Sequence, residues 1–336
     1  MKLQDKDISD LIDLLAQGYI RKADHPDLPL SIYNYTQKTQ FEGHWTPVTR
    51  QARGLILDDE YDIIVKPPEK FFNYDDPLAE NVERNHARYS AKLDGYMIIV
   101  KKDSEWGLIV ASRGSFTTQY AEAAKNFITK EVIEKMVPDW SYFCELCQNF
   151  PGDEAIILTQ HPVPKLVCWA IRDKDFNEVI PDDTCPFPIA KELSLFEADQ
   201  YLTEKVEGVV AQDLTTFERV KIKTPWFLEH HRLLSDCTKK RAWEILSNYQ
   251  KIDDLDIPDE FMAQMKQYEK EIGQEFDAVW KEVQNAKFAT ANLTDKELGL
   301  LDKYQELKPL IFLLRKNRTF ECFEKIWQKI KPRNVV

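Results

Sequence analysis

Residues 92–100 read KLDGYMIIV, and this stretch decides the fold of the region around it. The run of apolar and β-branched residues after Gly95 predicts a buried strand. We place Lys92 at the start of a strand, where a glycine three residues later lets its amine lie in a tight pocket. A lysine, an aspartate and a glycine at this spacing also arise by chance, so the surrounding residues must decide what the pattern means.

Three further charged runs lie in strand-like sequence after this stretch. Glu145 lies in the run FCEL, and Glu207 opens the run EGVV. Lys221 and Lys223 are two residues apart in KIK, so both ammonium groups lie on one face of a strand. Two cations aimed together repel each other. The pair therefore needs either a bound anion or carboxylates between its members.

Basic residues also lie on both sides of the lysine motif. Arg53 stands in ARGLILD, Lys70 in EKFFN and Arg113 in SRGS. Taken singly, each is best explained as an ordinary surface charge, and the two lysines of KIK as edge-strand residues that prevent aggregation. Together and in this order, they favour one shared site.

The chain divides into a strand-rich part and a helical part. Residues 6–20 carry apolar side chains at helical spacing, and further helices are expected near 119–136 and 190–204. Between about 30 and 230, turn clusters separate the β-rich runs GLILD, YDIIVK, GYMIIVKK, GLIVASR, YFCELC, AIILTQ, KLVCWAI, EGVVAQ and RVKIK. This mixture predicts an α+β domain over residues 1–235, with antiparallel sheets and mostly local strand pairing.

Residues 236–336 are predicted to form a separate all-α domain. Apolar residues from Phe261 to Val283 follow a three/four spacing, which predicts one long amphipathic helix. Thr294 and Glu297 have the spacing of a capping box at the start of another helix. A last amphipathic helix is expected close to the end of the chain.

The composition narrows the range of functions. The 336 residues include 45 Lys plus Arg and 57 Asp plus Glu, and the net charge of −12 argues against indiscriminate coating of nucleic acid. There is no signal-peptide pattern and no apolar run of about 18 residues, so we expect a soluble cytoplasmic protein, in the host cytoplasm if it is viral. Glycine-rich nucleotide fingerprints, P-loops and zinc-hydrolase motifs are absent from the sequence. Cys144 and Cys147 form a CxxC in a strand-like run, which favours buried thiols over zinc.

The order KxDG, FxE, EGVV and KxK resembles that of the covalent nucleotidyltransferases, which include DNA ligases, RNA ligases and mRNA capping enzymes. The flanking runs ARGLILD, EKFFN, SRGS and KIKTPWFLEHH resemble more specifically the RNA ligase 1 family of the T-even phage type. The resemblance covers about residues 30–232. Tyr96 departs from it, because the family often has a small residue after KxDG. The resemblance implies a ligase-type nucleotidyltransferase domain.

The resemblance also implies a covalent mechanism that consumes ATP. Lys92 matches the lysine that attacks the α-phosphorus of ATP to form lysyl-AMP. A free lysine has a pKa near 10.4, and we expect Lys221, Lys223 and a bound metal to lower that of Lys92. Glu207 matches the carboxylate that helps to hold Mg²⁺ or Mn²⁺. AMP then passes to a 5′-phosphate RNA end, and a 3′-hydroxyl end attacks it to join the strands.

Other family positions are implied to hold the nucleotide. Glu145 matches the residue that hydrogen-bonds the ribose, and Phe143, on the same strand face, would stack on adenine. Asp94 matches the motif aspartate, and Arg172 in AIRDKDF occupies a further family motif. The basic residues that match family positions around the phosphates are Arg53, Lys70, Arg113, Lys221 and Lys223.

The helical tail favours an RNA ligase within this superfamily. DNA ligases and capping enzymes carry a β-barrel OB domain after the KxK strand, whereas the sequence after Arg232 is helical. Residues 310–336 hold seven basic and two acidic side chains, which suit either a solvated helix face or the phosphates of a folded RNA such as a tRNA stem-loop. We expect a monomer in RNA repair, with a separate polynucleotide kinase/phosphatase as partner. The alternatives are an inactive relative that only binds RNA or nucleotide, and a DNA ligase or capping-type enzyme.

Overall fold

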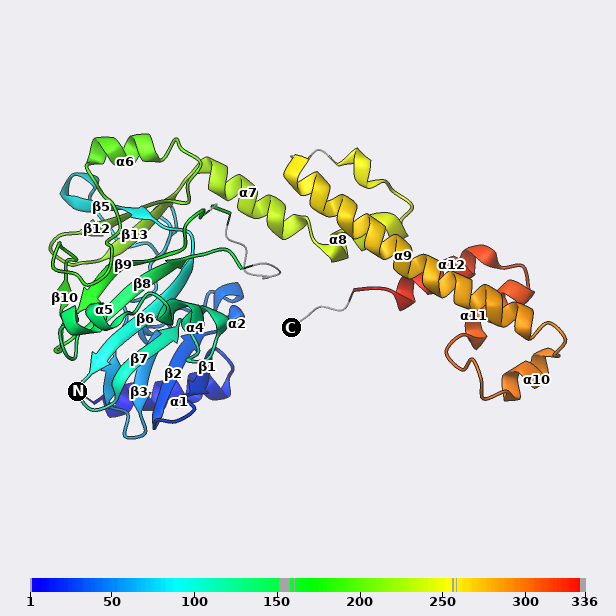
Figure 1. Ribbon diagram of the computed structural model, residues 1–336, viewed down its shortest axis with the longest axis horizontal. Helices are drawn as coiled ribbons and strands as arrows, with labels where there is room; N and C mark the ends of the chain where they lie inside the picture. Colours follow the sequence, from blue (N-terminus) through cyan, green and yellow to red (C-terminus); the bar gives the residue numbers. More distant parts are fainter. Residues whose placement is uncertain (1, 151–157, 160, 256, 258, 333–336) are drawn as a thin grey trace. The chain divides into compact units, whose positions relative to one another are not determined.

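The computed structural model describes residues 2–150, 158–159, 161–255, 257 and 259–332. Within it the chain divides into two compact units, Met1–Leu228 and Glu229–Val336. The division falls inside α7 (Pro225–Asp236). The labelled strands belong to the first unit, and helices α8–α12 belong to the second (Figure 1).

The first unit contains three sheets, and the named strands pair antiparallel within each of them. Sheet 1 has the order β1 (Ile20–Asp24), β2 (Leu30–Tyr35), β3 (Arg53–Asp58), β4 (Ile63–Val65). Sheet 2 has the order β10 (Glu178–Val179), β9 (Lys165–Arg172), β8 (Ser141–Cys147), β6 (Tyr96–Asp103), β7 (Gly107–Ser112). Sheet 3 has the order β11 (Glu192–Leu193), β5 (Ala87–Lys92), β12 (Gly208–Asp213), β13 (Arg219–Lys223).

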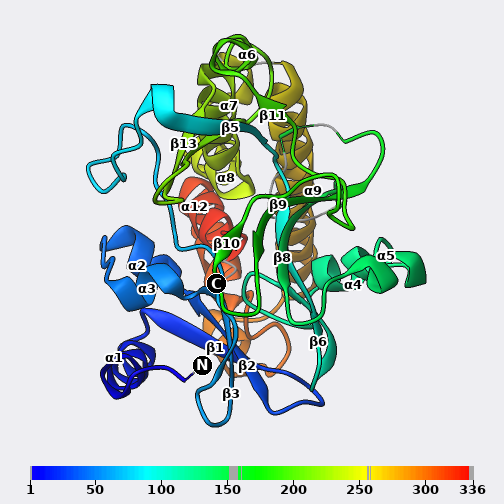
Figure 2. The same ribbon diagram turned by 90° about the vertical axis from the view of Figure 1, so that its left-hand side faces the viewer.

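Alternation along β6 shows how sheet 2 contributes to two cores. Met97 and Ile99 face sheet 1 and join a buried cluster with Ile32 and Ile56. Ile98, from the opposite face, packs in a second cluster under α4 (Gln119–Lys125) and α5 (Lys130–Lys135), which lie beside β6 (Figure 2). Burying both faces stabilises the sheet by the removal of apolar surface from water. Sheet 2 is therefore the central layer of the unit.

Short helices complete the first unit. Its other helices are α1 (Asp5–Ala16), α2 (Gln37–Phe41), α3 (Pro47–Gln51), the 3₁₀ turn Arg84–His86 and α6 (Leu195–Tyr201). The predicted helix at 119–136 is two helices, because Thr129 caps the start of α5 and interrupts the first one. The predicted helix at 190–204 is shorter, since Ser194 and Glu197 form a capping box at the start of α6.

Most predicted strands are present, but β1 and β2 were not predicted, and the lysine motif was placed wrongly. Lys92 ends β5 and does not start a strand, because the buried residues Tyr89 and Ala91 before it pair with β12. The predicted run AIILTQ falls mainly on residues outside the described part of the chain. Cys144 and Cys147 are buried free thiols in β8, as expected from the strand.

The second unit is helical throughout its described residues. Its elements are α8 (Lys239–Ser247), the 3₁₀ turn Ile252–Asp254, α9 (Asp259–Ala289), α10 (Asp295–Leu300), α11 (Lys308–Arg315) and α12 (Thr319–Lys329). The predicted long helix is α9, which packs apolar residues against α8, α11 and α12. The predicted capping box of Thr294 and Glu297 is present at the start of α10.

Candidate active site

Three adjacent strands of sheet 3 bring the motif residues together. Gly208, the first residue of β12, lies opposite Lys92 on one side and opposite Lys223 on the other. Glu207 directly precedes Gly208, and its carbonyl accepts a hydrogen bond from the backbone N–H of Thr224 at 3.0 Å. The register of the three strands therefore places Lys92 on one side of Glu207 and Lys223 on the other.

Glu207 bridges these two lysines. Its Oε2 accepts a hydrogen bond from Lys92 Nζ at 2.7 Å, and its Oε1 lies 3.1 Å from Lys223 Nζ. The side chain of Glu207 is only 7% exposed, and that of Lys92 is 20% exposed. Burial alone would raise the pKa of Glu207, but the two lysines outweigh burial and hold it below its usual value. Glu207 is thus a carboxylate anion that two ammonium groups stabilise.

The pKa of Lys92 lies above its ordinary value, so the prediction that neighbouring cations lower it is wrong here. Burial lowers the pKa of Lys92, but the charges of Glu207 and Glu145 and the Glu207 hydrogen bond outweigh burial. The prediction counted the charges of Lys221 and Lys223 but not the direct ion pair between Lys92 and Glu207. The site holds Lys92 as an ammonium until its contact with Glu207 is broken.

Gly208 and Gly95 are required by close backbone packing at this site. Gly208 has φ +149°, and a side chain there would place a Cβ 2.0 Å from the carbonyl oxygen of Ile222. A Cβ on Gly95 would lie 2.6 Å from the carbonyl oxygen of Leu146 and 2.9 Å from Cγ of Glu145. Both glycines therefore keep the strands close enough for their charged side chains to converge.

Lys221 and Lys70 form a second pair of lysines beside the first. The backbone of Lys221 donates to Phe72 O at 3.0 Å and accepts from Tyr74 N–H at 2.9 Å, so residues 72–74 run beside Lys221 in β13. Burial and then the charge of Lys70 lower the pKa of Lys221 to about 6. Burial and then Arg53 lower the pKa of Lys70 to about 8. At neutral pH, Lys221 resists protonation until an anion approaches it, whereas Lys70 stays mostly protonated.

Arg53 and Arg113 add two guanidinium groups to this set of cations. Arg53 starts β3 and donates to Sδ of Met97 at 3.0 Å. Arg113 is exposed and donates to the hydroxyl of Tyr35 at 3.3 Å. Burial lowers the pKa of Arg53, and the nearby charge of Arg113 lowers it further. An anionic ligand would relieve this mutual repulsion.

β8 places Glu145 and Phe143 on one face, as the alternation predicts. Burial raises the pKa of Glu145 to about 7, although the charge of Lys92 opposes that shift. Phe143 is fully buried in the apolar cluster between sheets 1 and 2. Its ring has no exposed face, so the structure does not present it as a surface on which a base can stack.

Trp169 is an aromatic residue at this site that the sequence analysis missed. It is the extra residue of a bulge in β9, between Cys168 and Ala170. Its ring lies 5.8 Å from the guanidinium carbon of Arg53, and its Nε1 is buried with no hydrogen-bond partner. The available signal was an aromatic residue in the run KLVCWAI, between the FCEL and EGVV motifs.

Asp94 and Tyr96 lie in different surroundings although both follow Lys92. Asp94 is buried, and its Oδ2 accepts the N–H of Thr159 at 2.9 Å, while burial raises its pKa. Its carbonyl oxygen lies 2.6 Å from Nε2 of His161. Tyr96 stacks on Tyr120 with ring centroids 3.9 Å apart, on the face of β6 opposite Met97. The size of Tyr96 therefore does not affect the opposite face of β6, where Met97 contacts Arg53.

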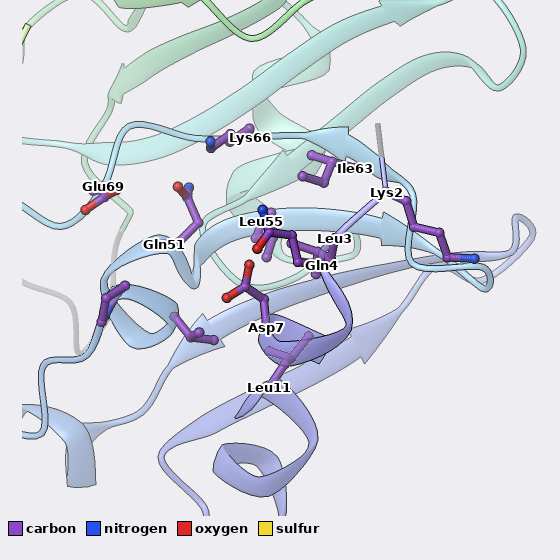
Figure 3. Close-up of a pocket in the computed structure, with 12 residues that line it drawn as sticks. Lys2, Leu3, Gln4, Asp7, Leu11, Gln51, Leu55, Ile63, Lys66 and Glu69 are labelled. Atoms are coloured by element: carbon purple, nitrogen blue, oxygen red, sulfur yellow. The ribbon is translucent and has the colours of Figure 1, made fainter. Parts of the chain in front are cut away.

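Arg172 binds a carboxylate other than Glu207. Its Nη2 lies 3.2 Å from Glu178, which also pairs with Arg219. A separate cavity of about 330 Å³ lies between α1, α3 and sheet 1 (Figure 3). Leu11, Leu55 and Ile63 contribute apolar lining to it, and none of the predicted site residues lines it.

The carboxylates at this site suit a divalent cation that arrives bound to the phosphates of a substrate. Among the described residues, no group of three or more His, Cys, Asp or Glu side chains is arranged to hold a metal ion. Glu207 offers one ionised carboxylate beside the cationic groups. Mg²⁺ is commonly bound through one or two carboxylates plus substrate phosphates. The residues therefore fit a phosphate-bound divalent ion and do not form an all-protein cage.

The fold and this cluster define a ligase-type nucleotidyltransferase domain joined to a helical C-terminal region. The sequence profile of the RNA ligase family, T4 type 1, matches residues 51–227, which is more than half of the chain. The protein belongs to the RNA ligase family. The matched residues all lie in the first unit, and the resemblance seen in the sequence is confirmed.

Similar solved structures are distant from this chain. An archaeal ATP-dependent RNA ligase (form 2) is 13% identical with a TM-score of 0.48, covering 77% of this chain and 74% of that one. A Naegleria gruberi RNA ligase with PPi is 17% identical with a TM-score of 0.34, covering 44% and 51%. A putative ATP-dependent DNA ligase from Aquifex aeolicus is 12% identical with a TM-score of 0.47, covering 95% and 77%. No curated protein matches the chain. Among the described residues, no helix has the length and apolar character needed to cross a membrane.

Proposed function

We propose that this protein is an ATP-dependent RNA ligase that joins a 5′-phosphate RNA end to a 3′-hydroxyl end through a lysyl-AMP intermediate. The observation that carries the proposal is the bridge from Lys92 through Glu207 to Lys223, beside the low-pKa lysine Lys221, in a chain of the RNA ligase family. A nucleophilic amine next to a set of cations is what attack on a triphosphate requires.

The first step transfers AMP from ATP to Lys92. The amine of Lys92 attacks the α-phosphorus, an N–P bond forms, the bond to the bridging oxygen breaks, and pyrophosphate leaves. Lys92 must first lose its proton to solvent and give up its hydrogen bond to Glu207. Lys223 remains as a partner for Glu207, so the carboxylate is not left buried without a counter-charge.

The cations then hold the phosphates. Lys221, Lys70 and Arg53 are short of counter-charge, so the triphosphate oxygens would complete their pairing. Glu207 would hold Mg²⁺ or Mn²⁺ together with the phosphates, and such an ion neutralises charge that develops on phosphate oxygens. Glu145 would accept a hydrogen bond from the ribose. Trp169 offers the partly exposed aromatic ring that adenine needs.

Two further transfers would complete sealing. An oxygen of the RNA 5′-phosphate attacks the phosphorus of lysyl-AMP, and Lys92 regains a proton as it leaves. The 3′-hydroxyl of the second end then attacks the 5′-phosphorus, a phosphodiester forms, and AMP departs. We assign these steps to the adenylyltransferase domain over residues 1–235. Residues 236–336 would select the RNA, with tRNA as one candidate and RNA repair in the cytoplasm as the setting.

Transfer of label from α-labelled ATP tests the proposal. With Mg²⁺ or Mn²⁺ the wild type should become labelled, and Lys92→Ala should not. Lys102→Ala is the matched control, because Lys102 is a partly buried lysine of β6 whose amine binds Ile133 O. No label on the wild type, or a persistent label on Lys92→Ala, would leave an inactive nucleotide-binding relative as the better interpretation. Label from GTP would favour a capping-type enzyme, and sealing of nicked DNA in preference to RNA would favour a DNA ligase.

A further inference from the structure

A cavity of about 600 Å³ lies at the far end of β13 from Glu207. One wall is formed by the tips of two hairpins, one between β9 and β10 and the other between β12 and β13. The other wall is formed by residues 68–71 with Arg50 and Glu80. Its volume lies in the range of small-molecule sites, about 300–1,000 Å³. All of these residues belong to the first unit.

A buried carboxylate fixes the two hairpins relative to each other. Glu178, with a side chain only 2% exposed, pairs with Arg172 of β9 at 3.2 Å and with Arg219 of β13. Arg172 also donates to Phe176 O at 3.1 Å, and Arg219 donates to Phe217 O at 3.4 Å. Each arginine therefore ties its own hairpin tip to the shared carboxylate. The cavity wall is built in advance of any ligand.

The two phenylalanines at these tips hold an unusual backbone conformation. Phe176 has φ 65° and Phe217 has φ 60°, in the left-handed region that non-glycine residues seldom adopt. Such conformations are energetically unfavourable and persist where the surroundings hold them, often at binding sites. Both residues line the cavity, and Phe176 also packs against the apolar cluster of α1 and sheet 1. The two strained hairpin tips therefore lie in the same wall.

β13 links this cavity to the proposed reaction centre. Arg219, Lys221 and Lys223 lie on one face of the strand, and alternate residues of a strand are about 7 Å apart. Lys223 binds Glu207, Lys221 lies one step further, and Arg219 lies in the cavity wall another step on. Lys70 belongs both to the cation cluster and to the cavity lining. A ligand in the cavity would therefore lie next to a phosphate held by these lysines.

The charges of the cavity select a neutral ligand. Four basic side chains line it (Arg50, Lys70, Arg172 and Arg219), and so do four acidic ones (Glu69, Glu80, Glu178 and Glu218). Arg50 contacts Glu69 and Glu80, and Glu178 holds the two arginines, so most of these charges are already paired. A phosphate would meet several carboxylates here. A nucleoside, with aromatic faces and hydrogen-bonding edges, suits the aromatic rings and polar groups of the lining.

Of the two RNA ends, only one presents a neutral terminal group. The 5′ end carries a charged phosphate, whereas the 3′ end is a nucleoside with free hydroxyls. We propose that this cavity binds the 3′-terminal nucleoside of the acceptor RNA, with Glu218 accepting a hydrogen bond from its 2′-hydroxyl. Glu218 is exposed and, among the described residues, forms no ion pair, although it accepts a hydrogen bond from Thr216. The proposal rests on the RNA ligase function proposed above and assigns the acceptor subsite.

Sealing with a pre-adenylylated donor, in the absence of ATP, isolates the step that uses the acceptor. Glu218→Gln should raise the acceptor KM about tenfold for RNA ending in a ribonucleotide, as loss of a charge-assisted hydrogen bond requires. With an acceptor ending in a 2′-deoxynucleotide, the same variant should match the wild type. Thr216→Trp, which fills the cavity from an exposed hairpin tip, should abolish sealing but keep lysyl-AMP formation.

Glu105→Gln is the matched control, because Glu105 is an exposed glutamate at the tip of the β6–β7 hairpin. It should leave every parameter unchanged. An acceptor KM within twofold of the wild type for both Glu218→Gln and Thr216→Trp would overturn the proposal. A raised KM for the donor or for ATP would also overturn it, by assigning the cavity to another substrate. Failure of the wild type to seal would instead refute the ligase function, before any variant is compared.

Discussion

Two neighbouring pairs of lysines at the candidate active site are held in opposite ways. Lys92 and Lys223 share the carboxylate of Glu207, and the pKa of Lys92 is raised. Among the described residues, Lys221 and Lys70 form no ion pair, and their pKa values fall to about 6 and about 8. The first pair, which we call the Glu207 end, is complete without a ligand. In the second pair, the Lys221 end, Lys221 gains its charge when an anion arrives. The position of one carboxylate therefore separates a protonated lysine, which we propose as the nucleophile after loss of its proton, from the lysines that we propose to hold phosphate.

Glu207→Ala should have the largest effect, because it removes the difference between the two ends. Lys92 and Lys223 would then lie together without a counter-charge, and a contact made in the transition state would be lost. We expect sealing to fall by at least two orders of magnitude, or roughly 3 kcal/mol, with the fold intact by circular dichroism. Glu192→Ala, in β11 of the same sheet, removes an exposed carboxylate and should seal normally. Near-normal sealing by Glu207→Ala would show that Glu207 has no catalytic role.

Lys221→Ala should also reduce sealing about a hundredfold, through loss of a phosphate contact. Removing the Lys221 charge should lower activity but raise the stability of the fold. A buried lysine whose pKa is lowered to about 6 is a strained group, and Lys221→Met should raise the free energy of unfolding by about 1–3 kcal/mol. Urea denaturation at pH 7 measures this change. A less stable Lys221→Met variant would contradict the lowered pKa.

Local patterns predicted most of the strands, missed β1, β2 and β5, and could not predict how these two ends differ. Alternation places Lys221 and Lys223 on one face of β13, and the structure keeps that face. The bridge from Lys92 to Glu207 joins residues far apart in the chain, through the pairing of β5 with β12. Mostly local pairing was expected, and it holds within sheet 1 but not for that pair of strands. The protonation of Lys92 depends on such distances, so its pKa was predicted with the wrong sign.

Local sequence patterns also could not predict which aromatic side chain is partly exposed at the site. Phe143 shares a strand face with Glu145, as period 2 requires, but the packing of sheet 1 against sheet 2 buries its ring completely. Trp169 reaches the site through a bulge, and a bulge shifts the alternation by one residue. Alternation along β9 alone therefore cannot tell which face Trp169 occupies. Only the paired strand fixes that position.

Trp169→Ala should have a smaller effect on activity, and this variant leaves both pairs of lysines unchanged. Loss of a stacking surface for adenine should raise the KM for ATP about tenfold, since stacking on one aromatic side chain contributes roughly 1–3 kcal/mol. Thermal stability should change little compared with Phe143→Ala, which removes a fully buried ring and should destabilise the fold by about 3–5 kcal/mol. An unchanged KM for ATP in Trp169→Ala, measured by the label-transfer assay, would remove Trp169 from the nucleotide site.

The smallest expected effect is a pH dependence that belongs to the Lys221 end alone. The folded protein lowers the pKa of Lys221 to about 6 and that of Lys70 to about 8, from ordinary values of 10.5. Between those values the unfolded chain binds more protons than the folded one, so these lysines make stability rise with pH from about 6 to 10. Binding a triphosphate should restore the protons, and affinity should therefore fall as pH rises through the same range. At pH 7.5, titration calorimetry of α,β-methylene-ATP in buffers of different ionisation enthalpy should detect uptake of about one proton. Lys221→Arg, whose guanidinium stays charged, should remove most of that uptake. Equal proton uptake by the wild type and Lys221→Arg would place the titrating group elsewhere. The two pairs of lysines would then not differ in protonation as we infer.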